Sequence, residues 1–425
     1  MRVLTALRIA PAVWGFPVIV FVGVRFVSLL TPPEAGPYPL ILTAVGAWAV
    51  AYVAPAAAGC AAWEAGRHKR AEWFAAPHAR STLTWCVRAL LPTVATCWLV
   101  LWAAVAYPFF AERELLPPDL RLVAVAMAMV LGHALAGWAL GAVLPVVVAV
   151  PAALGGSFLW FILPAASGPT WLYHLTGTWG RNCCRLHEEL APTALWGPLV
   201  FTVGLAVTAV LLTNAAATRR TAAAQMATLA PGIVALVVSA LLVGTLGPTG
   251  TQPRPASDLR CDSIGHVEVC VWPENERERE RLAPTIVGVL DKWSEAGIAT
   301  PAGLTEQREG SLPPDFLSFR ITAASAPSDL ISTLSASRLG SPPICPDRAD
   351  GGPPHAGYEA YEQLMAYFAQ SGGMPASELE RRYPPEGLAI ARRVALLGQD
   401  ARAEWLAGNM AAWTSCDIPA RPSPG

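Results

Sequence analysis

Few residues of this chain have the type and spacing that catalysis needs. The segment HEELA begins at His187 like the zinc-binding motif HExxH, but its fifth residue is Ala191 where the motif needs a second histidine. A phosphate-binding P-loop needs Gly-Lys-Ser or Gly-Lys-Thr, and neither Lys69 nor Lys292 follows a glycine. No G-x-S-x-G motif of a hydrolase nucleophile occurs either. We therefore expect no catalytic residues, no metal and no cofactor, and we expect that the protein is not an enzyme.

One histidine stands out because an apolar run surrounds it. His133 lies in VLGHALAGWALGAVLP, close to Gly132, Gly137 and Gly141. Small residues at four-residue spacing allow two membrane helices to approach closely, and an ionisable group inside a membrane is a functional candidate by default. Two interpretations are open. His133 either forms a hydrogen bond with a neighbouring helix as a neutral group, or it is an intramembrane polar site that lines a translocation path.

The elements that must position these residues are strongly apolar. The chain is 53% hydrophobic and only 14% charged, whereas about a quarter of the residues are charged in soluble domains. A helix needs about 20 apolar residues to cross a bilayer, and the candidate spans are residues 13–30, 40–62, 90–109, 122–140, 144–165, 195–215 and 233–246. The lipid bilayer is thus an expected partner. A net charge of -1 argues against nucleic acid, and many Arg with few Lys are typical of a GC-rich bacterial genome.

The basic residues of the short loops predict the orientation, because loops rich in Lys and Arg stay in the cytoplasm. With the N-terminus inside, the cytoplasmic segments hold Arg2, Arg8, Arg67, Lys69, Arg70, Arg80, Arg219 and Arg220. The outer loops hold only Arg113, Arg121, Arg181 and Arg185. We expect a multi-pass protein of the cell membrane with a cytoplasmic N-terminus, and an odd number of spans makes the C-terminal part extracytoplasmic.

The composition changes after residue 248. Residues 249–260 form a linker rich in Gly, Pro, Ser and Thr, and no apolar run of membrane length recurs in residues 261–425. HVEVCVW alternates as a half-buried strand, DFLSFRIT is typical of a second strand, and ENERERERLAPTIVGVLDKW has the apolar face of an amphipathic helix. The predicted fold is a polytopic α-helical membrane bundle of about seven helices over residues 1–248, followed by a soluble α+β domain over residues 261–425.

Six of the nine cysteines lie on the predicted outer side, where an oxidising compartment favours disulfides. We prefer Cys261 with Cys270, which closes a strand onto the segment before it, and Cys345 with Cys416, which ties the end of the domain to its middle. Cys183 and Cys184 are adjacent, so their pairing stays open. The alternative is that all of these thiols are free.

Charge is concentrated in WEAGRHKRAEWFAAPHAR, residues 63–80, between the second and third spans. Trp73 and Phe74 stand here beside Glu64, Arg67 and Arg70, and aromatic residues next to arginine are typical of interface anchors. The alternative is a positive-inside loop whose aromatics lie at the level of the lipid headgroups.

This arrangement resembles the permease of type-2 ABC exporters. The resemblance covers residues 1–220. It consists of the inside N-terminus, the charged segment between spans two and three, the tight turn in GWALGAVLPVVVAVPAAL, and the outer amphipathic re-entry TWLYHLTGTWGRNCCRLHEEL. In this family the segment between spans two and three is a coupling helix that docks into a groove on a separate ATP-binding subunit. Residues 64–78 match it here, with Glu64, Arg67, Arg70, Trp73 and Phe74 as the partner-binding residues. The added seventh span and outer domain depart from the family.

The resemblance implies a permease-like subunit of an ABC transport system that works as a homo- or hetero-dimer with a separate ATPase, on a substrate that the sequence does not reveal. Two further hypotheses stay open. The chain is a membrane-anchored sensor or accessory protein whose outer domain binds a peptide or an envelope component, or the outer domain is a diverged hydrolase.

Overall fold

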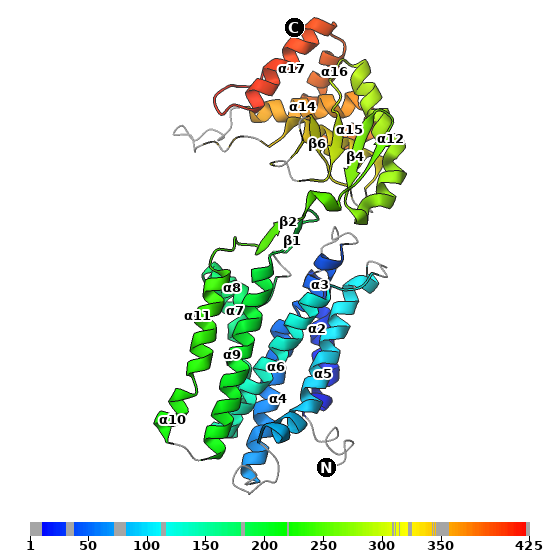
Figure 1. Cartoon of the computed structure of the whole chain (residues 1–425). Helices are drawn as coiled ribbons and strands as arrows, with labels where there is room; N and C mark the ends of the chain where they lie inside the picture. The colour runs from blue at the N-terminus through cyan, green and yellow to red at the C-terminus, as the bar shows by residue number, and fades with distance from the viewer. Residues whose placement is uncertain are drawn as a thin grey trace. The chain divides into compact units, whose positions relative to one another are not determined.

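The computed structural model describes residues 11–30, 38–71, 82–111, 116–179, 183–218, 221–307, 310, 312–313, 315–321, 325–341, 343, 345 and 357–421. The chain divides into two compact units, Met1–Arg254 and Pro255–Gly425 (Figure 1). The division falls inside the predicted linker, residues 249–260. The structure agrees with the coarse prediction of a helical bundle followed by a unit that contains both helices and strands.

The first unit is built from helices that are long enough to cross a membrane. Its elements are α2 (Pro11–Leu30), α3 (Pro39–Ala47), α4 (Val50–Arg70), α5 (Thr82–Ala111), α6 (Leu120–Val143), α7 (Val146–Ser167), α8 (Thr170–Leu175), β1 (Glu188–Leu190), α9 (Pro192–Ala217), α10 (Ala222–Ala227), α11 (Ala230–Val243) and β2 (Thr251–Pro253). Within the part of the chain that the structure describes, six spans are long and apolar enough by length and composition, and α3 and α4 form one of them. The seventh predicted span, α11, has 14 residues and a length of about 21 Å, which is shorter than a bilayer core.

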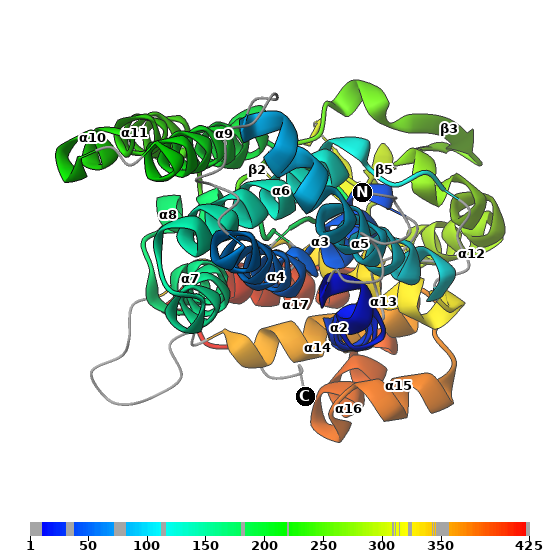
Figure 2. The same ribbon diagram turned by 90° about the horizontal axis from the view of Figure 1, so that it is seen from below.

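The strand pairing nevertheless shows where the chain goes after α9. β1 precedes α9, β2 follows α11, and the two strands pair antiparallel. Helix α9 therefore leaves the end of the bundle that holds β1, and α10 and α11 bring the chain back to it (Figure 1). A Cβ atom built on Gly204 of α9 would lie 2.1 Å from the Cβ atom of Ala235 of α11, so the two helices lie in close contact, side by side in Figure 2.

The two ends of the bundle differ in composition. We call one the basic end, defined by Arg67, His68, Lys69 and Arg70 of α4 and by the turn at residues 144–145 between α6 and α7. We call the other the linker end, defined by Tyr38, α8, β1 and β2. One prediction differs from the structure here: α4 continues to Arg70, so the charged segment begins as part of the second span and not as a separate helix.

Close backbone contact joins α4 to α6. A Cβ atom on Gly137 would lie 2.1 Å from the carbonyl oxygen of Ala58, and one on Gly141 would lie 2.3 Å from that of Ala62. These are backbone atoms, which cannot rotate away. The glycines that flank His133 in sequence therefore serve helix contact, as small residues do in membrane bundles.

The second unit contains a four-stranded sheet with helices. Its elements are η2 (Ala256–Asp258), β3 (Arg260–Ile264), β4 (Val267–Val271), η3 (Pro273–Asn275), α12 (Glu276–Glu295), β5 (Gly303–Thr305), β6 (Phe316–Ser318), α13 (Pro327–Leu339), α14 (Tyr358–Ser371), α15 (Ala376–Arg382), α16 (Pro385–Ala395) and α17 (Gln399–Trp413). The strand order is β3-β4-β5-β6, with β3 antiparallel to β4 and the other pairs parallel. In β4, alternate valines are buried as the sequence pattern predicted, and Cys270 between two of them is buried as well. With the apolar face of α12, the core includes Val267, Val269, Val271, Leu282, Ile286, Val289, Leu290 and Trp293.

Candidate functional site

At the basic end, the last turn of α4 is joined to α6. Lys69 Nζ donates a hydrogen bond to the carbonyl oxygen of Val143, the last residue of α6, at 2.8 Å. His68 Nδ1 donates to the carbonyl oxygen of Glu64 at 2.8 Å, and its ring lies 5.7 Å from that of Trp138 on α6. The basic side chains also lie at the C-terminal, negative end of the α4 dipole, which stabilises their positive charge. The end of α4 is therefore fixed to the turn between α6 and α7.

Glu64 differs from what the sequence analysis expected of it. Its residue is 4% exposed, and its carboxylate lies 3.4 Å from the guanidinium of Arg67. A carboxylate that is buried and paired in this way is covered by the bundle itself. Arg67 is half-buried and Arg70 is exposed, so these two are accessible. Trp73 and Phe74 lie outside the described residues, and the structure does not place them.

His133 lies in the middle of the bundle and contacts α7. It is 6% exposed, its Nδ1 lies 2.7 Å from the hydroxyl of Ser157, and its ring lies 5.1 Å from that of Phe161. Its Nε2 atom has no hydrogen-bond partner among the described residues. The contact with Ser157 is the interhelical hydrogen bond of the first interpretation. A cavity of about 10 Å³ is lined by Leu135, Trp138 and Asn214, and two of these residues lie on α6 as His133 does. It is about large enough for one water molecule.

The linker end is closed by α8 and the turn after it. Tyr173, His174 and Leu175 are buried, and the hydroxyls of Thr176 and Thr178 lie 2.6 Å apart. Gly177 has φ +61° and lies against the sulfur of Met129 on α6, where a side chain would clash. Of the segment that the resemblance interpreted as an amphipathic re-entry, residues 170–175 form the helix α8, whose last three residues are buried, and residues 188–190 form β1.

His174 connects this segment to the chain after α11. Its Nε2 atom donates a hydrogen bond to the carbonyl oxygen of Gly247 at 2.9 Å. Burial lowers the pKa of His174 below its ordinary value, although this hydrogen bond opposes the shift. The imidazole is therefore neutral at neutral pH.

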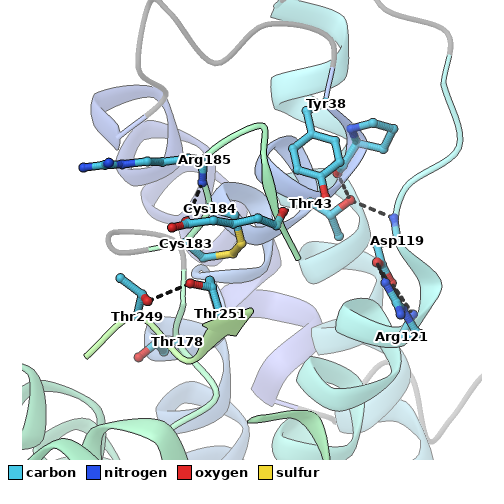
Figure 3. Close-up of a disulfide and its surroundings, with 12 residues drawn as sticks. Tyr38, Thr43, Asp119, Arg121, Thr178, Cys183, Cys184, Arg185, Thr249 and Thr251 are labelled. Atoms are coloured by element: carbon cyan, nitrogen blue, oxygen red, sulfur yellow. Dashed lines mark hydrogen bonds and ion pairs between the residues drawn. A yellow bond between two sulfur atoms is a disulfide. The ribbon is translucent and has the colours of Figure 1, made fainter. Parts of the chain in front are cut away.

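A disulfide between Cys183 and Cys184 lies at the same end, between α8 and β1 (Figure 3). From the sequence alone this pairing stays open, and the structure shows it formed. To the right of the disulfide in Figure 3, Tyr38 links the start of α3 to β1, and Thr43 links α3 to the residue before α6. The Tyr38 hydroxyl donates to the carbonyl oxygen of Glu188 at 2.9 Å, and the Asp119 amide donates to the Thr43 hydroxyl at 2.8 Å.

The second unit contains the two disulfides that the sequence analysis preferred. Cys261 and Cys270 are cross-strand neighbours in the β3–β4 pair, and Cys345 bonds Cys416 after α17. Within the described residues, the sulfurs of Cys261 and Cys270 and the carboxylate of Glu268 form a group at metal-ligand spacing. Both sulfurs are used by the disulfide, so the group has no thiolate to offer a metal.

Sequence reasoning missed a buried carboxylate in this unit. Glu306 is 5% exposed and accepts hydrogen bonds from the amide of Trp272 at 2.9 Å, from the side chain of Asn275 at 2.7 Å and from the amide of Ile321 at 3.3 Å. Burial raises the pKa of Glu306 to about 7, against the effect of the three donors. Glu306 lies directly after β5, whose three residues give no strand signal, so its segment has the pattern of an exposed loop.

The same unit has a groove with a volume of about 450 Å³ between α12, α13 and the turn after α14. Val289 and Ile331 give it an apolar wall, and Lys292 and Glu378 give it charge. The Lys292 side chain lies over Gly373, whose φ is +85°. The volume is within the range of small-ligand sites, about 300–1,000 Å³.

Comparison with known proteins adds one match. A family described as "Domain of unknown function (DUF7224)" matches residues 269–416, from β4 to the last cysteine of the second unit. No curated protein and no protein of solved structure matches the chain. The match covers the second unit and leaves the bundle without a counterpart. In this comparison the chain is therefore similar to the DUF7224 family in its second unit alone.

Proposed function

We propose that the chain is a permease-like membrane subunit of an ABC transport system that works with a separate ATPase. The observation that carries the proposal is the connection at the basic end. Because Lys69 holds the end of α6, a force on the segment after Arg70 reaches α4 and α6 together. A transport subunit needs such a connection to convert the motion of a partner into motion of its helices.

The proposal includes an orientation. The basic end is cytoplasmic, since it carries the Arg and Lys side chains of α4. The linker end and the second unit are extracytoplasmic, where an oxidising environment maintains the three disulfides. In this orientation Arg67 and Arg70 lie on the cytoplasmic side, with Arg70 exposed. Trp73 and Phe74 follow them in sequence as the proposed anchors of the ATPase.

The test is recovery of an ATPase from membranes with the full chain. The double substitution Trp73→Ala/Phe74→Ala should abolish recovery, because truncation of an interface anchor costs about 1–4 kcal/mol of binding. Trp63→Ala is the matched control, since Trp63 lies on α4 and is exposed where a membrane helix meets lipid. Absence of an ATPase with the unmodified chain, or equal recovery with the double variant, would contradict the proposal.

The groove beside Lys292 supports a second candidate function. A membrane-anchored sensor or accessory protein would use this groove to bind a peptide or an envelope component, and the bundle would be its anchor. This candidate predicts no ATPase in the same pull-down. The two functions are therefore separated by one experiment.

A further inference from the structure

One face of α12 lines the groove of the second unit. Thr285, Gly288 and Lys292 lie on this face, and each contributes to the groove wall. Residues three or four apart lie above one another on a helix, so the face extends over about two turns. Gly288 stands in the middle, and a Cβ atom built there would have no atom within 4 Å. A side chain at this position would therefore project into open space.

The facing wall comes from the first turn of α13 and from the segment between α14 and α15. It consists mostly of proline and glycine around one isoleucine: Pro327, Ile331, Gly372, Gly373 and Pro375. Ile331 is 5% exposed, and Val289 on the α12 side is 1% exposed. Proline has no backbone N–H and glycine has no side chain, so this wall offers little hydrogen bonding. A ligand would be held by apolar contact and by the charged groups.

The two charged side chains of the groove differ in their pairing. The carboxylate of Glu378 is paired with Arg381 and also lies 3.2 Å from Nε of Arg382. Lys292 pairs with no carboxylate among the residues that the structure describes. The negative charge of the groove is therefore already compensated, whereas its positive charge is not. An anionic group is the complement of this arrangement.

The position of the Lys292 side chain depends on Gly373. A Cβ atom built on Gly373 would lie 2.1 Å from Nζ and 2.8 Å from Cδ of Lys292. Gly373 also has φ +85°, a conformation that favours glycine. The lysine stem thus lies along the backbone of the turn after α14. The residue as a whole is exposed, so its ammonium group is accessible to a ligand.

We propose that this groove binds the C-terminal end of a peptide, with Lys292 as the partner of the terminal carboxylate and the apolar wall in contact with the last side chains. An ammonium and a carboxylate form a strong, charge-assisted hydrogen bond, and capture of a C-terminal carboxylate is a recurring mode of peptide recognition. A volume of about 450 Å³ is that of a small-ligand site, which suits the end of a peptide better than the middle of a long one. The inference rests on the second candidate function, whose ligand it specifies, and it does not depend on an ATPase.

The test compares two probes on the full chain in lipid nanodiscs. Both are pools of acetylated tripeptides of Ala, Val, Leu and Phe, one with a free C-terminal carboxylate and one with a C-terminal carboxamide. Saturation-transfer NMR gives the concentration of each pool at half-maximal binding. The carboxylate pool should bind about tenfold more tightly, the difference that one hydrogen bond between charged groups supplies.

Four variants locate the binding. Lys292→Gln should remove the preference for the carboxylate pool, and Lys292→Arg should keep most of it. Arg277→Gln is the matched control, because Arg277 is an exposed cation of the same helix that does not line the groove. Gly288→Leu should weaken binding of both pools, since the new side chain would occupy the groove without displacing any atom of the fold.

The outcomes separate this inference from the functions proposed above. Equal binding of the two pools, or a preference that survives Lys292→Gln, would overturn the role of Lys292 and leave a peptide-binding groove for the second candidate function. A preference that survives Gly288→Leu would place the peptide elsewhere and overturn the site. Failure of both pools to bind would overturn the inference and count against a peptide ligand. Recovery of an ATPase from membranes is a separate measurement that none of these results changes.

Discussion

The two units of this chain differ in their closest contacts, although both bury large side chains, Trp138 and Phe161 in the bundle among them. In the bundle, α4 turns a row of alanines toward its neighbours, each at most 2% exposed: Ala54, Ala57, Ala58, Ala61, Ala62 and Ala65. Facing them, α6 offers glycines, so backbones touch. In the second unit, the core contains large aromatic side chains, among them Trp272, Trp293, Tyr367 and Phe368.

This difference follows from the solvent of each unit. Between membrane helices there is no hydrophobic gain in burying large side chains, so contact area comes from close approach. In water, burial of an aromatic side chain removes a large apolar area from solvent. The bundle therefore depends on the absence of side chains at a few positions, and the second unit depends on the presence of a few large ones. We therefore expect the bundle to be sensitive to side chains added at its contact glycines, and the second unit to the loss of its large aromatic side chains.

The largest effect is expected at Trp293. This residue is fully buried on α12, and its Nε1 atom donates to the carbonyl oxygen of Phe368 on α14 at 3.0 Å. Trp293→Ala removes the ring and its hydrogen bond, although the carbonyl oxygen of Phe368 still accepts from the Gly372 amide at 2.8 Å. The cavity that it leaves should destabilise the second unit by about 3–5 kcal/mol. Chemical denaturation of the full chain, followed in the second unit by hydrogen exchange, measures the loss.

Leu396→Ala is the control for this prediction, since Leu396 is 88% exposed and its truncation should cost almost nothing. The bundle should stay unchanged in both variants. Equal stability of the two variants would show that the aromatic core is not what holds the second unit together.

A smaller and pH-dependent effect is expected at Glu306. Its pKa of about 7 in the folded state lies above the ordinary value of 4.5, so the folded unit binds more protons between these values than the unfolded chain does. The stability that the protonated group contributes is present below about pH 4.5 and is lost as pH rises through about 7. The total change is about 3 kcal/mol at most.

Glu306→Gln should remove this dependence, and Glu268→Gln on the exposed face of β4 should keep it. The measurement is the free energy of unfolding of the second unit at pH 5 and pH 8. A wild-type stability that rises with pH over this interval would mean that the three donors outweigh burial and that the carboxylate is charged in the fold.

In both units, the sequence predicted the elements that have a long or regular hydrophobic pattern and missed the short or exposed ones. Long apolar runs predicted the spans well, because a 20-residue run leaves few alternatives to a helix. The amphipathic pattern of α12 and the alternation of β4 were readable for a similar reason. The strands β3 and β5 were missed, since β3 is exposed on both faces and β5 has three residues.

The contacts at the ends of the bundle were less predictable. A linker rich in Gly, Pro and Thr has the composition of a free tether, and only the pairing of β2 with β1 shows that it is part of the fold. Burial of Glu64 was missed because a charged residue near the end of a span resembles a solvated one in sequence. Disulfides were easier, because few cysteines lie in the second unit. Cys261 and Cys270 are only 9 residues apart, and the pair of Cys345 with Cys416 uses the remaining two.

The smallest effect, and the sharpest test of the comparison, concerns two glycines in the bundle. A methyl group on Gly137 would lie 2.1 Å from the carbonyl oxygen of Ala58, whereas one on Gly156 of α7 would have no atom within 4 Å. Alanine favours a helix over glycine by about 1 kcal/mol, so Gly156→Ala should stabilise the bundle slightly. Gly137→Ala receives the same gain but must push α4 away from α6, at a cost of about 1–3 kcal/mol or more, and should destabilise it by about 2 kcal/mol. Unfolding of the full chain in detergent with increasing SDS measures both. If the two variants shift stability in the same direction, α4 and α6 do not depend on backbone contact, and the contrast between the two units fails.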